Sequence, residues 1–129
     1  MTHQRLLVLL LRLAGLFTVT AFLAMLLPQD WMAATHEWLG LGVFPRAPVV
    51  DYLARSVAAL YGFHGVLLLI IARDPARYRT IVRFVGWMNV VFGAMMIVVD
   101  LHAGMPLYWT VAEGPPIVAF GAIVLYLTR

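Results

Sequence analysis

The sequence predicts an all-α membrane protein, a bundle of four transmembrane helices with up-down-up-down topology. Composition is the first reason, because 64% of the 129 residues are hydrophobic and only 12% are charged, about half the roughly 25% of a soluble domain. The second is that the apolar residues form four runs of roughly 20 residues, enough to cross a hydrocarbon core about 30 Å thick. We expect one domain, 1–129, with helices over about 6–27, 49–72, 80–101 and 107–127 and an interfacial segment over about 30–40.

The distribution of charge is the third reason and predicts the orientation. All nine basic residues are arginines. Most lie near the chain ends or between the second and third helices: Arg5, Arg12, Arg73, Arg77, Arg79, Arg83 and Arg129. Five of the six acidic residues fall toward the other side: Asp30, Glu37, Asp51, Asp100 and Glu113. The positive-inside rule therefore predicts both termini in the cytoplasm. The basic cluster sets this topology or binds anionic lipid heads.

The first apolar run could also be a secretory signal peptide, because Arg5 precedes it. However, the run is long for such a signal, Arg12 interrupts it, and no clear cleavage site of small residues follows. We therefore expect it to remain in the protein as the first helix.

A short helix is predicted in the first connection. Asp30 is placed to cap it, Trp31 and Trp38 recur near helical spacing, and Gly40 or Gly42 is suited to end it. Because tryptophan favours the headgroup level, this helix is expected to lie on the outer membrane surface.

The second helix contains polar residues that are costly to place in a bilayer. Asp51 and Arg55 are four residues apart at its outer end, which predicts an ion pair. Either this ion pair has a structural role and caps the outer end of the bundle, or its guanidinium binds an anionic group. His64 lies near the middle of the helix, at the depth of Asn89 on the third helix, and a hydrogen bond between these two side chains is expected.

The third helix has one polar stripe, formed by Asn89, Gly93, Met96 and Asp100. The stripe runs from mid-membrane to the outer end, where Asp100 is a candidate ligand-binding residue.

The fourth helix contains Glu113-Gly114-Pro115-Pro116 inside its apolar run. Proline lacks an N–H and clashes with the carbonyl four residues earlier, so this helix is expected to be kinked or broken. A broken helix with a nearby carboxylate can form a substrate or ion site. Glu113 is then the leading site residue, with Trp109 one turn earlier as a cavity wall. Alternatively, Glu113 simply caps a short tilted helix.

No cofactor or metal site is predicted. The chain has no cysteine, which excludes thiolate metal sites and dithiol redox chemistry. A haem or quinone site would use His64 and His102, but no second histidine matches His64 in depth. His36 and His102, each beside a carboxylate, are weak candidates for a metal.

The segments HEWLGLG, YLARS, DLHAGMPLYW and EGP resemble those of small uncharacterised bacterial four-helix membrane proteins. More remotely, the chain resembles the DoxX-like group in its size and helix count. The resemblance covers nearly the whole chain and implies an inner-membrane four-helix bundle, with no established activity and no residue role.

The function predicted from these residues is binding rather than catalysis, and no nucleic-acid motif is present. We expect an outward-facing polar pocket, lined by Glu113, Asp100 and Arg55, that holds a small amphipathic molecule or a lipid headgroup. The protein would act in the bilayer as a homo-oligomer or as a subunit of a larger complex. One alternative is a homo-oligomeric, proton- or cation-coupled transporter or channel using Glu113. A further one is a membrane redox subunit using His64 and His102.

Overall fold

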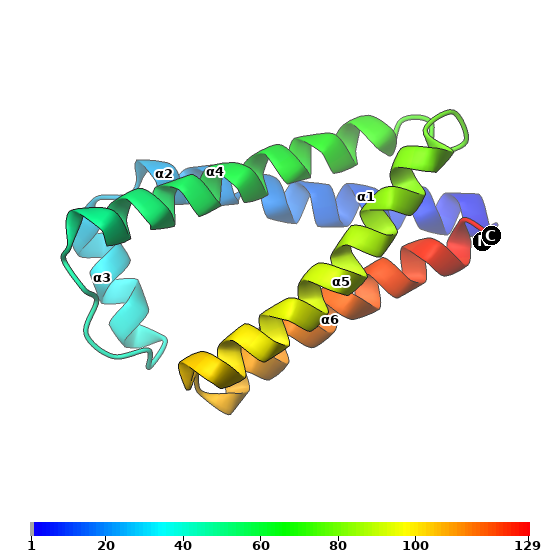
Figure 1. The fold of residues 1–129 in the computed structure, drawn as a ribbon. Coiled ribbons are helices and arrows are strands. Elements are labelled where there is room, and N and C mark those ends of the chain that lie inside the picture. The colour runs from blue at the N-terminus through cyan, green and yellow to red at the C-terminus, as the bar shows by residue number, and fades with distance from the viewer. Residues whose placement is uncertain (1) are drawn as a thin grey trace. The chain divides into compact units, whose positions relative to one another are not determined.

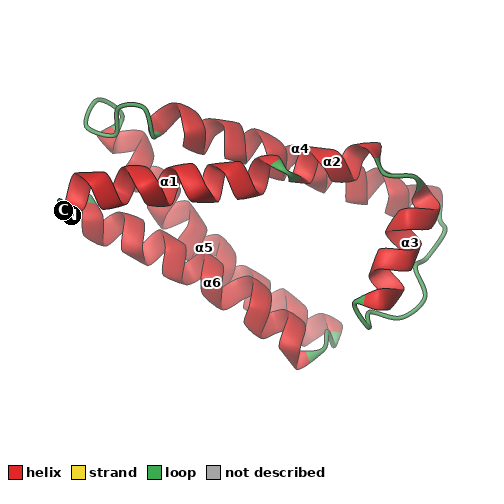
Figure 2. Cartoon of the chain, turned by 180° about the vertical axis from the view of Figure 1, so that it is seen from behind, coloured by secondary structure: helices red, strands yellow, loops and turns green. Residues whose placement is uncertain are grey.

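Residues 2–129, the part that the computed structural model describes, form helices joined by loops, with no strand among them (Figures 1 and 2). Four segments are long and apolar enough to cross a membrane, and each lies within three residues of its predicted range. The predicted class, an all-α membrane protein with four long apolar helices, is confirmed. The helices are α1 (His3–Val19), α2 (Ala21–Leu26), α3 (Gln29–Trp38), α4 (Pro48–Ile71), α5 (Arg79–Ala103) and α6 (Leu107–Leu127).

The first membrane span differs from the continuous helix expected, because it is interrupted at Thr20 between α1 and α2. The Thr18 hydroxyl donates to the Ala14 carbonyl at 2.8 Å, and the Thr20 hydroxyl donates to the Phe17 carbonyl at 2.5 Å. Threonine hydroxyls that bond back to carbonyls of the preceding turn bend helices. The Thr20 N–H also bonds Phe17, three residues earlier, which tightens the turn.

The predicted short helix in the first connection is present as α3. Its N-cap is Pro28 rather than the expected Asp30, which lies in the first turn and pairs with Arg46 at 2.8 Å. Its end is as expected, because Gly40 has a φ of +74° and donates its N–H to the Glu37 carbonyl.

Contacts divide the chain into two compact units, each described separately here. Unit 1 combines the chain up to Leu9 with Ile71–Arg129, and unit 2 is Leu10–Ile70. The single domain and the mutual packing of all four spans therefore stay predictions.

In unit 1, α5 and α6 form an antiparallel pair whose backbones approach most closely at two glycine contacts (Figure 1). A Cβ on Gly121 would lie 2.5 Å from the Gly86 carbonyl oxygen, and one on Gly93 would lie 2.8 Å from the Gly114 carbonyl oxygen. The two glycines on each helix are seven residues apart, so both fall on one face. The helices thus approach until backbone meets backbone, as small residues allow inside membranes.

In unit 2, the first span packs antiparallel against α4 by the same means. A Cβ on Gly65 would lie 2.6 Å from the backbone nitrogen of Val19, and one on Gly62 would lie 2.6 Å from the Phe22 ring. Val19 and Phe22, on successive turns of the first span, are therefore in close contact with α4.

The fourth span was expected to be kinked or broken, and the break is excluded, whereas the kink stays a prediction. The α6 helix runs without interruption from Leu107 to Leu127, with Pro115 and Pro116 inside it. Both prolines are exposed, whereas the neighbouring Gly114 is buried against α5. The prolines remove the hydrogen bonds to the Val111 and Ala112 carbonyls. These two losses lie on the exposed side of the helix, and the remaining hydrogen bonds and the α5 contact hold α6 together.

Candidate functional site

Asp100 is the one buried acidic residue among the described residues. It lies in the last turns of α5 and is 3% exposed. Its backbone carbonyl accepts the Met105 N–H at 2.9 Å, which closes the helix end before the turn at Gly104. Its side-chain Oδ2 is buried and has no hydrogen-bond partner within residues 2–129. A buried polar atom without a partner costs about 1–3 kcal/mol, and more when charged, so it calls for a partner.

Thr110 on α6 supplies a second polar group of the same kind. It is 4% exposed, and its Oγ1 likewise lacks a partner in the described chain. A Cβ on Gly114 would collide with the Ile97 side chain, so Gly114 lies directly against Ile97. Asp100 follows Ile97 by three residues and Thr110 precedes Gly114 by four. Since the helices are antiparallel, Asp100 and Thr110 share one level of the pair to within about one turn.

Glu113 and Trp109 form a third polar element on α6. The Trp109 Nε1–H donates to Glu113 Oε2 at 2.7 Å, which confirms that the two share a face of the helix. Both side chains are half-buried. The indole therefore holds the carboxylate in one orientation and covers part of it.

These four residues, Asp100, Thr110, Trp109 and Glu113, are called the acidic end of unit 1. It holds two carboxyl groups and no arginine, because every arginine of unit 1 belongs to the opposite end of its helices. The unit's arginines are Arg5, Arg73, Arg77, Arg79, Arg83 and Arg129. A hydrogen-bond donor or a cation is the chemical complement of such an arrangement.

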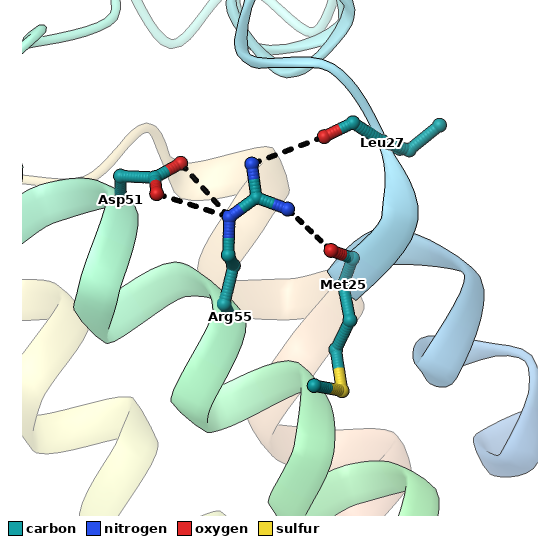
Figure 3. Close-up of polar contacts among 4 residues, drawn as sticks. All are labelled: Met25, Leu27, Asp51 and Arg55. Carbon is teal, nitrogen blue, oxygen red and sulfur yellow. Dashed lines mark hydrogen bonds and ion pairs between the residues drawn. The ribbon is translucent and has the colours of Figure 1, made fainter.

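Arg55, a predicted ligand-binding residue, makes its contacts with Asp51 and with the end of the first span (Figure 3). Its Nε lies 3.1 and 3.0 Å from the two carboxylate oxygens of Asp51, which confirms the predicted ion pair. The other two guanidinium nitrogens donate to the carbonyls of Met25 and Leu27, where α2 ends. Carbonyls at a helix C-terminus lack partners within the helix. Arg55 therefore joins α4 to the end of the first span, and each of its nitrogens already has a partner.

Two other predicted site residues lie in different units. The buried Asn89 donates its amide Nδ2–H to the Val85 carbonyl, one turn earlier on α5, at 2.8 Å. His64 lies on α4 of unit 2 and is half-buried. Their mutual hydrogen bond stays a prediction.

The two weak metal candidates are not gathered into a cluster. His36 bonds through Nδ1 to the Gly42 carbonyl at 2.9 Å, and its ring meets Phe44 edge-on at 5.4 Å between centroids. His102 is exposed in the last turn of α5. Over residues 2–129, no group of three or more histidine and acidic side chains is placed to hold a metal ion.

Sequence reasoning missed Thr110. A threonine inside an apolar run is a weak signal, because its hydroxyl usually bonds back to its own helix, as Thr18 and Thr128 do here. The useful signal was its spacing. Thr110, Gly114 and Gly121 recur on one face of α6, the face that packs against α5.

The fold and the residues together define an all-α integral membrane protein with a polar, acidic end on one helix pair. Comparisons with protein-family models, with curated protein sequences and with solved structures give no match. Function is therefore argued from the side chains alone.

Proposed function

We propose that this protein binds the polar head of a small amphipathic molecule at the acidic end of unit 1, without an enzymatic activity of its own. The observation that supports this most is the buried Oδ2 of Asp100, which lacks a partner. A carboxyl group inside a membrane protein is costly unless it is paired, and such residues usually mark functional sites.

The chemistry of the site selects a ligand head that donates hydrogen bonds, such as an amine or a polyol. Asp100 and Glu113 offer carboxylate oxygens, and Thr110 Oγ1 can accept one more bond. An anionic head would be repelled by the two carboxylates, since no arginine of unit 1 belongs to this end of its helices. The apolar surfaces of α5 and α6 beside the site suit the ligand's hydrocarbon part, so an amphipathic molecule is preferred.

The proposal places the acidic end on the outer side of a bacterial inner membrane. The positive-inside rule supports this orientation, because the arginines of unit 1 lie at the opposite end. The protein would act as a homo-oligomer or within a larger membrane complex.

Proton- or cation-coupled transport is the second candidate function. It is favoured by the same two carboxyl groups and by the orientation that Trp109 gives to Glu113. Four spans leave little room for a pore, so transport would need a homo-oligomer. In that case Glu113→Gln would abolish ion flux into vesicles. Under the binding proposal, Asp100→Asn would instead reduce ligand retention.

The test is native mass spectrometry of the protein purified in mild detergent. Wild type is expected to carry a bound small molecule whose retention falls about tenfold in Asp100→Asn, because charge-assisted hydrogen bonds contribute about 1.5–3 kcal/mol. The matched control is Asp74→Asn, which removes an exposed carboxylate at the other end of unit 1. Equal retention in both variants, or a wild type without any bound molecule, would count against the proposal.

A further inference from the structure

A second site, separate from the acidic end, lies where α1 begins, α5 begins and α6 ends. We call this the basic end of unit 1. It contains an open pocket of about 240 Å³. The pocket is lined by His3, Gln4, Leu7, Pro75, Ala76, Arg79, Leu127, Thr128 and Arg129.

The pocket is cationic, because two arginines line it and none of its lining side chains is acidic. Arg79 donates one guanidinium N–H to the Thr128 carbonyl at 3.0 Å, which fixes it beside the end of α6. A guanidinium has five N–H donors, so most remain for a ligand. The Thr128 hydroxyl is already used by the Val124 carbonyl.

Tyr126 holds the other two basic groups at the edge of the pocket. The Arg129 guanidinium carbon lies 5.4 Å from the centroid of the Tyr126 ring, and the His3 ring centroid lies 5.9 Å from it. A cation over an aromatic face is attracted to it, so Arg129 is restrained rather than free in solvent. Arg79 and Arg129 are thus both fixed by neighbours.

The start of α5 adds to the positive field. Arg79 is its first residue, and the N-cap residue Tyr78 makes no side-chain cap hydrogen bond. The first N–H groups of a helix lack partners within it, and the positive end of the helix dipole lies there. The 25-residue helix therefore presents partial positive charge in addition to the arginines.

The other half of the lining is apolar, which distinguishes this pocket from a patch of charge that only sets topology. Leu7 and Leu127 belong to membrane-spanning helices, and Leu7 is 4% exposed. A pocket with arginines on one side and the ends of membrane helices on the other matches the boundary between a headgroup and its chains. Its volume is somewhat below the roughly 300–1,000 Å³ of sites for drug-sized ligands, so it suits a headgroup.

We propose that this pocket binds the phosphate group of an anionic phosphate ester, held by Arg79 and Arg129. The ester comes either from an anionic phospholipid of the surrounding bilayer or from a soluble glycerol phosphate. The site is independent of the one proposed for the acidic end, because it uses opposite charge and opposite ends of α5 and α6.

The experiment measures lipid retention by native mass spectrometry, with phosphatidylglycerol and phosphatidylcholine as competing probes. Wild type retains phosphatidylglycerol preferentially. Arg79→Gln lowers this retention about fivefold, the effect of roughly one arginine at a membrane surface. The matched control is Arg73→Gln, which removes the same charge from the connection before α5. Arg73 does not line the pocket, so this variant leaves retention unchanged.

A second variant distinguishes the effect of the space inside the pocket from the effect of its charge. Ala76→Trp fills the exposed turn that lines the pocket and keeps every arginine, so it also lowers retention. Helical content and thermal unfolding, measured in parallel, identify any variant that has failed to fold. Glycerol phosphate and inorganic phosphate are then added as soluble competitors. Displacement of the lipid by either assigns a soluble ligand to the pocket, and failure of both assigns the lipid.

Two results would overturn the proposal. One is equal retention of phosphatidylglycerol and phosphatidylcholine by wild type. The other is an equal loss in Arg73→Gln and Arg79→Gln, which would show that only the total charge matters.

Discussion

Replacing Gly121 by alanine tests the close approach of α5 and α6, on which the acidic end depends. The new Cβ would lie 2.5 Å from the Gly86 carbonyl oxygen and 2.7 Å from the Val90 backbone nitrogen. Both are backbone atoms, so no rotamer change can relieve the contacts. The helices must separate by roughly 0.5–1 Å, a gap that forfeits a quarter to a half of each dispersion contact along the interface.

The size of the effect follows from two opposing contributions. Overpacking a well-packed contact costs typically about 1–3 kcal/mol. Alanine is preferred over glycine in a helix by roughly 0.8–1 kcal/mol, which offsets part of this cost. Because both contacts are with backbone atoms, the overpacking cost falls in the upper part of its range, and we expect a net loss of about 1–2 kcal/mol in the free energy of unfolding.

The assay is reversible unfolding in mixed micelles with increasing dodecyl sulfate, followed by circular dichroism. The matched control is Ala122→Val, which enlarges the exposed residue next to Gly121 on α6. This control should unfold like wild type. If Gly121→Ala were as stable as wild type or more stable, the tight contact between the two helices would be refuted.

Three further changes have defined outcomes. Arg55→Ala should destabilise unit 2 by about 1–2 kcal/mol, because the Asp51 carboxylate and the Met25 and Leu27 carbonyls lose a charged partner. A double-mutant cycle with Asp51→Ala should give a coupling energy below about 1 kcal/mol, since the ion pair is partly exposed. A wild-type-like unfolding midpoint for Arg55→Ala would contradict this role. Pro115→Ala restores an N–H at an exposed position of α6 and should leave stability equal or raised; a clear loss would mean that the proline itself is required. Trp109→Phe removes the hydrogen bond to Glu113 and should lower thermal stability by about 1 kcal/mol, whereas an unchanged melting temperature would contradict it.

The spans could be predicted from the sequence because the cost of placing polar groups in lipid dominates their positions. A run of about 20 apolar residues has few alternatives to a membrane helix. The sequence also predicted that Asp51 and Arg55 share a helix face, and that Trp109 and Glu113 do, since residues four apart on a helix lie on one face. In both pairs the structure places the side chains in direct contact.

What could not be predicted depends on contacts between segments distant in the sequence. Arg55 could be given one partner from spacing, but its bonds to Met25 and Leu27 depend on where the first span ends. Of the kink or break predicted in α6, the break is absent, because both prolines lie on the exposed side of the helix while the opposite side packs against α5. Thr110 acquires significance only because the contact with α5 buries it.

The most direct test of the account is whether the acidic end binds a cationic amphiphile through Asp100. Isothermal titration calorimetry would compare hexylammonium with hexanesulfonate, using the protein in phosphatidylcholine nanodiscs and empty nanodiscs as the blank. We expect saturable binding of hexylammonium to wild type that is lost in Asp100→Asn, and no saturable binding of the sulfonate. Equal binding of hexylammonium by wild type and Asp100→Asn, or a preference for the sulfonate, would contradict it.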